Sequence, residues 1–332
     1  MILHPGIMAL VLTSFLMSLM TLYASSFAVQ ILLCWDIASG SELQLALERR
    51  TYLISTVISY FLAFQLLSLF LFIHTADSIC HLFVGSMCAV GTISVNNFGY
   101  PTLLLKVATF ILAGLWLILN YADNRAFDYP LIRAKYLLLL IMTPIVLAET
   151  VMQGIYFLGL RPDIITSCCG SLFSQGSSVT ASEILAMPVM PMKVIFYTSM
   201  MATFASGARC LLRNTGGYLF ALMSGVTSLI AIVSIISFIS LYIYEMPAHH
   251  CPFCILQKEY GYVGYLLYTL LLLGTVTGLG VGLLQLFRHK ESIEKIILTA
   301  QWQLVAVSCI SFFIFMVTVT LQMLFSNLLL TG

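Results

Sequence analysis

Six of the nine cysteines in this chain occur as three closely spaced pairs. The pairs are Cys80 and Cys88, Cys168 and Cys169, and Cys251 and Cys254. A cysteine thiolate is a nucleophile toward disulfides and a ligand for soft metals, so such pairs could exchange electrons or bind a metal ion. These pairs are therefore the residues that the rest of the chain must position.

The third pair forms a Cys-x-x-Cys motif in the segment His-His-Cys-Pro-Phe-Cys-Ile-Leu-Gln-Lys, residues 249–258. Two cysteines at this spacing fit the first turn of a helix, where the helix dipole and the motif favour the thiolate. Lys258 follows Cys254 by one turn and would add positive charge. We therefore predict that Cys251 exchanges with a partner thiol, that Cys254 resolves the mixed disulfide, and that Lys258 favours the thiolate.

Residues 250–265, with Cys-Pro-Phe-Cys-Ile-Leu-Gln-Lys followed by apolar residues and tyrosines, resemble the DsbB family of quinone-linked, disulfide-generating membrane proteins. The resemblance implies a dithiol, Cys251 and Cys254, at the outer mouth of a helix. It also implies electron transfer to a membrane quinone whose head lies near Lys258, where the family has arginine. The resemblance does not extend to the rest of the chain.

The same atoms also permit a metal site. Cysteine thiolates combined with histidine or methionine are ligands suited to copper or another soft metal. The candidate ligands beside Cys251 and Cys254 are His249, His250, Met187, Met190, Met192 and His81. Redox chemistry and metal binding both remain open for this motif.

The other two pairs cannot each form a disulfide on regular backbone. Adjacent cysteines such as Cys168 and Cys169 bridge each other only through a distorted peptide. On one straight helix the Cα atoms of Cys80 and Cys88 would lie about 12 Å apart, too far for a disulfide, so this pair needs a bend in the chain or other partners. We expect these four cysteines either to relay electrons to a soluble partner or to form disulfides that link the outer loops.

The composition predicts an all-α integral membrane protein. The chain is 61% hydrophobic and only 8% charged, whereas a soluble domain carries about 25% charged residues. The net charge of +1 gives no reason to expect a nucleic-acid partner. Eight apolar runs are long enough to span a bilayer, and we expect one transmembrane domain over 1–332 that contains about eight helices. The expected helices are 6–34, 51–75, 99–121, 136–160, 190–211, 216–245, 260–287 and 299–326.

Basic residues predict the orientation. Four alternate loops hold Arg49, Arg50, Arg125, Arg133, Lys135, Arg209, Arg213, Arg288, Lys290 and Lys295, which are ten of the fourteen basic residues. Cytoplasmic loops carry the excess of Lys and Arg, so both termini and all three cysteine pairs are expected on the opposite face. An oxidising outer compartment would permit disulfides there. We therefore expect a bacterial inner membrane with the cysteine loops facing the periplasm or exterior, although an organellar membrane is also possible.

Polar residues within the expected helices form a second candidate site. Glu149 lies near the middle of a run, with Gln153 four residues later on the same face. A carboxylate at this depth usually marks an ion, proton or substrate path. The structural alternative is a protonated Glu149 that hydrogen-bonds to Gln153 or a neighbouring helix. Lys106 is expected to extend toward the membrane surface or to pair with Asp77.

Three functions follow as hypotheses. The first is a thiol–disulfide oxidoreductase that passes electrons between an outer dithiol and a thioredoxin-like or other soluble partner, or a membrane quinone. The second is a membrane protein that binds or transports copper or another soft metal. The third is a structural subunit that joins other membrane subunits in a respiratory or secretion complex.

Overall fold

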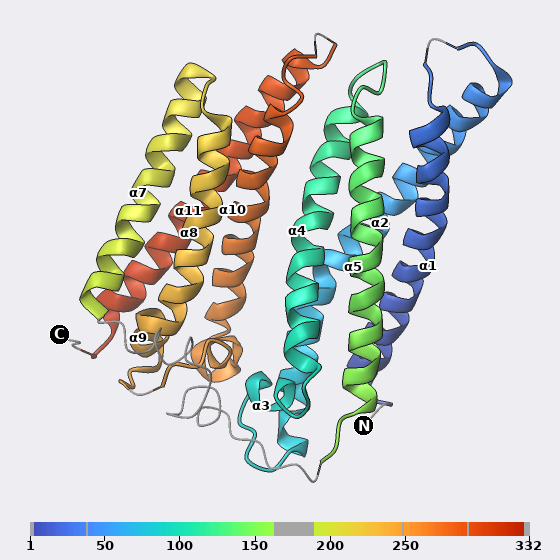
Figure 1. Cartoon of the computed structure of the whole chain (residues 1–332). Coiled ribbons are helices and arrows are strands. Elements are labelled where there is room, and N and C mark those ends of the chain that lie inside the picture. Colours follow the sequence, from blue (N-terminus) through green and yellow to red (C-terminus); the bar gives the residue numbers. More distant parts are fainter. Residues whose placement is uncertain (1–2, 38, 163–188, 248, 291, 329–332) are drawn as a thin grey trace. The chain divides into compact units, whose positions relative to one another are not determined.

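The computed structural model describes residues 3–37, 39–162, 189–247, 249–290 and 292–328. Within these residues the chain is entirely helical and contains no strand (Figure 1). The prediction of an all-α membrane protein is confirmed, because seven of the helices are long and apolar enough to cross a membrane.

Eight long helices follow the eight predicted apolar runs. They are α1 (Pro5–Cys34), α2 (Glu42–Ser78), α4 (Gly99–Asp123), α5 (Ile132–Leu158), α7 (Val189–Arg213), α8 (Gly217–Ser234), α10 (Val263–Gln285) and α11 (Glu294–Phe325). The short elements are α3 (Ala89–Ile93), α9 (Ser240–Tyr244), the 3-10 helices η1 (Cys80–Leu82), η3 (Cys254–Leu256) and η4 (Lys258–Tyr260), and the π-helix η2 (Ile235–Ile239). Most predicted ends lie within a few residues of the observed ones.

Helix α7 accounts for the difference between the predicted eight spans and the seven found. It has the length of a span, 25 residues, but it is not among the seven helices apolar enough to cross. Its sequence includes Lys193, Arg209 and a series of hydroxyl-bearing residues beginning at Tyr197. Polar groups in a lipid-facing helix cost free energy, so α7 is a weaker candidate for a span than its length suggested.

Helix α2 begins nine residues before its predicted start, at Glu42 rather than at residue 51. The added residues, Glu-Leu-Gln-Leu-Ala-Leu-Glu-Arg-Arg, are strong helix formers. Arg49 and Arg50, expected in a loop, therefore lie on the helix. The charged residues Glu48, Arg49 and Arg50 set the start of the predicted span at residue 51, but the helix itself begins at Glu42.

The chain divides into two compact units, and the prediction of a single domain stays a prediction. Unit 1 comprises 1–75, 95–160 and 286–300, and unit 2 comprises 76–94, 161–285 and 301–332. In unit 1, α5 packs against both α1 and α4. Its core includes the buried side chains of Met17, Phe27, Ile58, Trp116 and Tyr136.

In unit 2, α8 packs against α7 and α10. Small residues permit the close approach of α8 and α10. A Cβ atom on Gly278 would lie 2.4 Å from the Ser224 side chain, and one on Gly282 would lie 2.6 Å from Ala221 Cβ. The glycine-rich stretch of α10 is therefore a packing feature.

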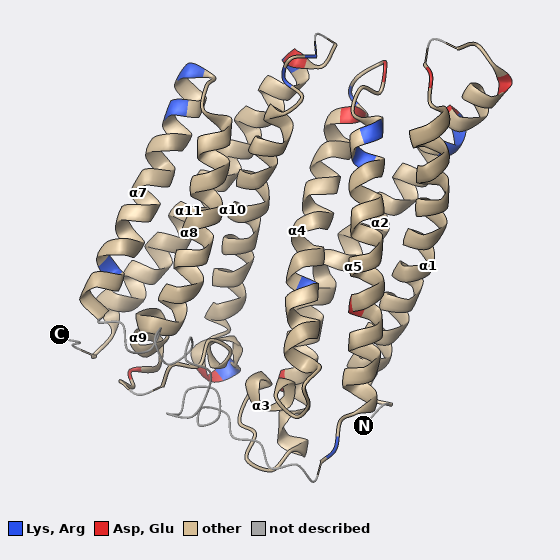
Figure 2. Cartoon of the chain, viewed as in Figure 1, with Lys and Arg blue, Asp and Glu red and all other residues tan. Residues whose placement is uncertain are grey.

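Basic residues gather at one end of the helices in each unit. In unit 1 most of the Lys and Arg residues of α1–α2 and α4–α5 lie toward the end away from the N-terminus, and Lys106 lies within α4 (Figure 2). In unit 2 the two arginines of α7 lie at the end that leads into α8 (Figure 2). The face of the membrane to which these ends belong remains a prediction from the charge rule.

Candidate functional site: a buried group of three cysteines

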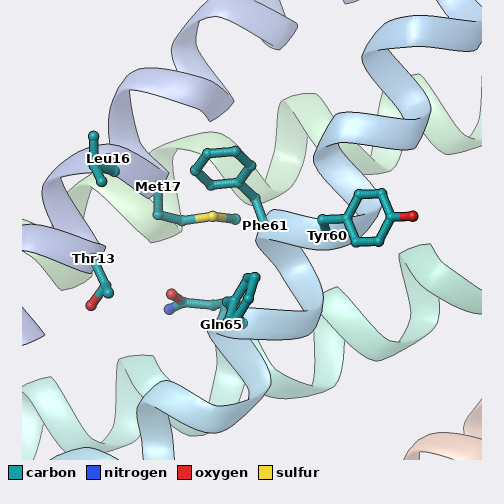
Figure 3. Close-up of a pocket in the computed structure, with 7 residues that line it drawn as sticks. Thr13, Leu16, Met17, Tyr60, Phe61 and Gln65 are labelled. Atoms are coloured by element: carbon teal, nitrogen blue, oxygen red, sulfur yellow. The ribbon is translucent and has the colours of Figure 1, made fainter.

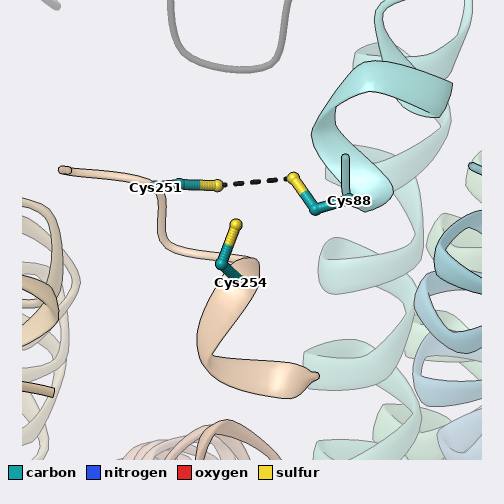
Figure 4. A group of neighbouring side chains, drawn as sticks. All are labelled: Cys88, Cys251 and Cys254. Carbon is teal, nitrogen blue, oxygen red and sulfur yellow. Dashed lines mark hydrogen bonds between the residues drawn. The ribbon is translucent and has the colours of Figure 1, made fainter. Parts of the chain in front are cut away.

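Cys88, Cys251 and Cys254 meet in unit 2, and we call them the cysteine triad (Figure 4). All three are buried thiols, and their sulfur atoms lie within 4.8 Å of one another. The Sγ atoms of Cys88 and Cys251 are 3.6 Å apart. This is van der Waals contact, well beyond the length of an S–S bond, about 2.05 Å.

The Cys-x-x-Cys motif lies before helix α10, and the prediction that it forms the first turn of a helix is wrong. Cys251 lies in irregular backbone and Cys254 begins the 3-10 helix η3. Gln257 then adopts an extended conformation, and Gly261 has a φ of +62°. These two breaks separate the motif from α10, so the dipole of that helix cannot be assigned to the dithiol.

A glycine lets the motif pack onto the helix that follows it. A Cβ atom on Gly264, in the first turn of α10, would lie 2.8 Å from the carbonyl oxygen of Ile255. Only glycine permits this approach without moving the backbone of η3. Gly264 therefore holds the turn that carries Cys254 against α10.

Cys88 reaches the motif because the chain bends after α2. Helix η1 carries Cys80, Gly85 has a φ of +82°, and Cys88 is the N-cap residue of α3. The bend expected from the spacing of Cys80 and Cys88 is therefore present. Cys80 is only half-buried, whereas Cys88 is fully buried.

Two polar side chains connect the Cys88 segment to the Cys-x-x-Cys segment. The Gln257 amide donates hydrogen bonds to Asp77 Oδ1 at 3.1 Å and to the Met87 carbonyl at 2.8 Å. Asp77 Oδ1 also accepts a hydrogen bond from the Ala89 backbone N–H at 3.2 Å. We call Asp77 and Gln257 the clamp, because together they hold the residues on both sides of Cys88.

Two tyrosines hold the backbone of the motif. The Tyr244 hydroxyl donates to the Cys251 carbonyl, and the Tyr268 hydroxyl donates to the Pro252 carbonyl at 2.7 Å. Neither tyrosine was predicted from the sequence to belong to this site, and Asp77 was considered only as a partner of Lys106. Asp77 carried a detectable signal, since it is a lone carboxylate beside an apolar run and close to Cys80.

The other predicted residues of the motif lie elsewhere. Lys258 lies on η4 with its side chain exposed, whereas the thiols of Cys251 and Cys254 are buried. The ring of His249 packs edge-on against Tyr244 at 4.6 Å between centroids. His250 Nδ1 lies 3.0 Å from the Ile236 carbonyl oxygen of the π-helix. Neither histidine belongs to the described group of convergent ligands around the triad.

The remaining candidate metal ligands are dispersed. His81 is exposed on η1. Met190 is 54% exposed and Met192 only 3% exposed, so these two methionines, two residues apart on α7, lie in different environments. Cys168, Cys169 and Met187 lie outside the described residues.

A second polar site lies within the helices of unit 1. Glu149 on α5 and Lys106 on α4 form a buried ion pair at 2.8 Å. The Gln65 amide donates to both carboxylate oxygens of Glu149, at 2.8 and 3.0 Å, and Lys106 also donates to Ser68 Oγ at 2.8 Å. Lys106 therefore pairs with Glu149, and the expected pairing with Asp77 or extension toward the membrane surface is wrong.

Gln153 belongs to a neighbouring contact rather than to Glu149. Its amide donates to the Leu10 carbonyl and to Ser14 Oγ, both at 3.0 Å. A nearby cavity of about 320 Å³ is lined by Thr13, Leu16, Met17, Tyr60, Phe61, Phe64 and Gln65 (Figure 3). The surface that faces the cavity is almost wholly apolar, because the polar residues of the lining contribute little of it. The cavity therefore resembles lipid-facing surface more than a polar substrate path.

The two sites differ in the chemistry that they allow. The Lys106–Glu149 ion pair of unit 1 is held by further hydrogen bonds to Gln65 and Ser68, whereas the triad of unit 2 can form a disulfide between sulfurs already in contact. The triad could also hold a metal ion. No family model, curated protein or solved structure matches the chain.

Proposed function

We propose that this integral membrane protein is a thiol–disulfide oxidoreductase whose centre is the cysteine triad. The observation that carries the proposal is the contact of 3.6 Å between Cys88 Sγ and Cys251 Sγ. Exchange requires one sulfur to attack a disulfide formed by two others. A Cys-x-x-Cys pair with a third thiol against its first cysteine supplies these three atoms.

The exchange with a soluble, thioredoxin-like partner proceeds in two attacks. A thiolate of the partner attacks the disulfide of the site, forms a mixed disulfide and releases one cysteine as a thiolate. The second thiolate of the partner then attacks the mixed disulfide, so the partner leaves oxidised and the site holds two thiols. Two electrons and two protons have moved to the site, and a membrane quinone would take them, become a quinol and restore the disulfide.

Burial of the triad limits the route by which a partner reaches it. Cys251 is 0% exposed and Cys254 is 5% exposed. Cys80 is the half-buried thiol in the segment that leads to Cys88. We therefore infer that the partner exchanges first in this segment, and that Cys88 passes the oxidation to or from Cys251.

Soft-metal binding is the second candidate, and the convergence of three thiols favours it. Sulfurs bound to one zinc ion at about 2.3 Å in tetrahedral geometry are about 3.8 Å apart, close to the 3.6 Å between Cys88 and Cys251. Three thiolates would carry three negative charges, of which zinc cancels two and Cu(I) cancels one. Burying the remaining charge is costly, whereas a disulfide beside a thiol is neutral, so redox exchange is the better fit.

The leading proposal is tested by the double variant Cys251→Ser/Cys254→Ser. The full chain is reconstituted in vesicles that contain a quinone, and oxidation of a reduced thioredoxin-like protein is measured. We expect the rate to fall to that of empty vesicles, while the exposed thiol variant Cys34→Ser keeps the parental rate. Unchanged oxidation by the double variant would reject the proposal.

Metal content separates the two candidates. Protein purified under reducing conditions is analysed for copper and zinc, and its thiols are titrated. An exchangeable disulfide without bound metal supports the oxidoreductase, whereas one equivalent of metal that is lost in Cys88→Ala supports metal binding. Unreactive, bridged cysteines in a protein that copurifies with other membrane subunits would instead favour a structural subunit.

A further inference from the structure

The clamp acts on the two residues that flank Cys88. The Met87 carbonyl accepts from Gln257, and the Ala89 N–H donates to Asp77. Gln257 also donates to Asp77, so one hydrogen-bonded unit fixes the backbone on both sides of Cys88. Gln257 lies three residues after Cys254, and its position is therefore tied to that of the motif.

We propose that Asp77 and Gln257 are positioning residues that set the approach of Cys88 to Cys251 and thereby favour the Cys88–Cys251 disulfide over the Cys251–Cys254 disulfide. This inference rests on the proposed oxidoreductase function. The hydrogen bonds of Asp77 and Gln257 reach the backbone of Met87 and Ala89, the two residues that flank Cys88. Their effect is to hold one reacting segment against the other.

The reaction that the clamp controls is an internal exchange. The Cys88 thiolate attacks Cys251 Sγ of the Cys251–Cys254 disulfide. The Cys88–Cys251 bond forms, the Cys251–Cys254 bond breaks, and Cys254 leaves as a thiolate that takes up the proton lost by Cys88. No electrons are gained or lost, so the ratio of the two disulfides measures their relative stability.

The geometry explains why the clamp selects one product. Cys251 and Cys254 are three residues apart and meet whenever the turn at Pro252 forms. Cys88 is 163 residues from Cys251, so its local concentration depends on contacts between the two segments. Reacting atoms held in contact gain a large advantage over atoms that must find each other.

The test measures both disulfides in one sample. The purified full chain is oxidised with a small excess of diamide, its remaining thiols are alkylated, and the two disulfide-linked peptides are quantified by mass spectrometry. Gln257→Leu removes both donations by the amide, and we expect the ratio of Cys88–Cys251 to Cys251–Cys254 to fall about tenfold, because one of the lost bonds has a charged acceptor. Asp77→Leu should have a similar effect.

Matched variants separate positioning from general stability. Asp77→Asn keeps an oxygen that can accept from Gln257 and Ala89, so it should retain most of the parental ratio. Gln301→Leu removes a buried glutamine elsewhere in unit 2, which donates to Gln285 Oε1 at 2.8 Å, and it should leave the ratio unchanged.

The outcomes also distinguish this inference from the proposed function. A parental ratio in Gln257→Leu, with both disulfides formed, would overturn the positioning role and leave the oxidoreductase proposal standing. If the parental chain forms neither disulfide, the proposed function itself fails. Equal losses in Gln257→Leu and Gln301→Leu would also overturn the inference, because the effect would then reflect general stability.

Discussion

Unit 1 buries the Lys106–Glu149 ion pair between long helices, whereas unit 2 gathers the cysteine triad in the irregular segments between helices. The side chains of Lys106 on α4 and Glu149 on α5 meet directly, with Lys106 Nζ 2.8 Å from Glu149 Oε1. Cys88 and Cys251 are brought to 3.6 Å by a helix cap and a coil segment. The first arrangement is fixed by helix packing, and the second depends on a few hydrogen bonds.

The difference indicates where each unit tolerates change. A buried ion pair that loses one partner leaves an uncompensated charge in a medium of low polarity. A buried thiol is uncharged and can lose a neighbour without that penalty. We therefore expect substitutions at the Lys106–Glu149 pair of unit 1 to lower the free energy of unfolding. Substitutions in the cysteine triad of unit 2 should instead change disulfide formation.

The largest effect should come from breaking the Lys106–Glu149 ion pair of unit 1. Lys106→Met leaves Glu149 buried without its cation, and we expect a loss of about 3–5 kcal/mol in the free energy of unfolding. Cys88→Ala removes only a sulfur atom from the triad and should cost about 1–2 kcal/mol. Thermal unfolding of both variants in the same detergent provides the comparison.

The double variant Lys106→Met/Glu149→Leu sharpens this prediction. It removes both charges and should recover most of the lost stability, since an apolar pair of similar volume often replaces a buried ion pair. A double variant that is as unstable as the single one would show that the pair is not the source of the effect. Equal losses in Lys106→Met and Cys88→Ala would remove the contrast between the units.

An intermediate effect is expected at Gly264, where the motif packs on α10. Gly264→Ala places a Cβ atom 2.8–2.9 Å from the backbone of Ile255, so η3 must move. Overpacking of this kind costs about 1–3 kcal/mol, and it should also lower the fraction of the Cys88–Cys251 disulfide after diamide oxidation.

Gly154→Ala in unit 1 is the matched control for Gly264→Ala. A Cβ atom at Gly154 meets no described atom within 4 Å, and alanine is a better helix former than glycine by about 1 kcal/mol. We expect unchanged or slightly higher stability, measured by the same thermal unfolding. Equal destabilisation by the two substitutions would contradict the close packing inferred at η3.

The smallest effect concerns an exposed charge in unit 2. The Asn327 backbone N–H, at 2.9 Å, and the Asn327 side chain donate to Glu245 and lower the pKa of that carboxyl below its ordinary value of 4.5. A lowered pKa contributes stability above the ordinary pKa and loses it as the pH falls through the lowered value. The protection factors of the amides of residues 326–328, which correct for the pH dependence of intrinsic hydrogen exchange, should therefore fall below about pH 4.5.

Asn327→Ala tests the origin of this acid sensitivity. The variant lacks the side-chain donor, so the protection factors of residues 326–328 should be lower at neutral pH and should change less on acidification. An unchanged pH profile in the variant would assign the effect to another group.

The long helices could be predicted from the sequence because their apolar runs are continuous. Lipid requires a spanning backbone to satisfy its own hydrogen bonds, so a run such as 99–121 determines α4 almost to the residue. The start of α2 could not be predicted in this way. A predicted span ends where the apolar run ends, whereas a helix ends where its backbone hydrogen bonding ends. Residues 42–50 are polar in part but continue the helical hydrogen bonding of α2.

The contacts of the two sites could be predicted only in part. The sequence identifies Cys251 and Cys254 by their spacing and Glu149 by its depth in an apolar run. The choice of Cys88 over the other outer cysteines, and of Lys106 as the partner of Glu149, depends on how distant segments pack. The break between the motif and α10 depends on the backbone conformations of Gln257 and Gly261, for which the sequence provides only a weak turn signal.

The separation of 163 residues between Cys88 and Cys251 has a consequence for the synthesis of the protein. At roughly 5–20 residues per second, Cys88 leaves the ribosome about 8–33 seconds before Cys251. During that interval the other cysteines synthesised before Cys251 are its possible partners, namely Cys34, Cys80, Cys168, Cys169 and Cys210. The nascent protein must therefore keep Cys88 reduced, or undo early pairings, before the triad can assemble.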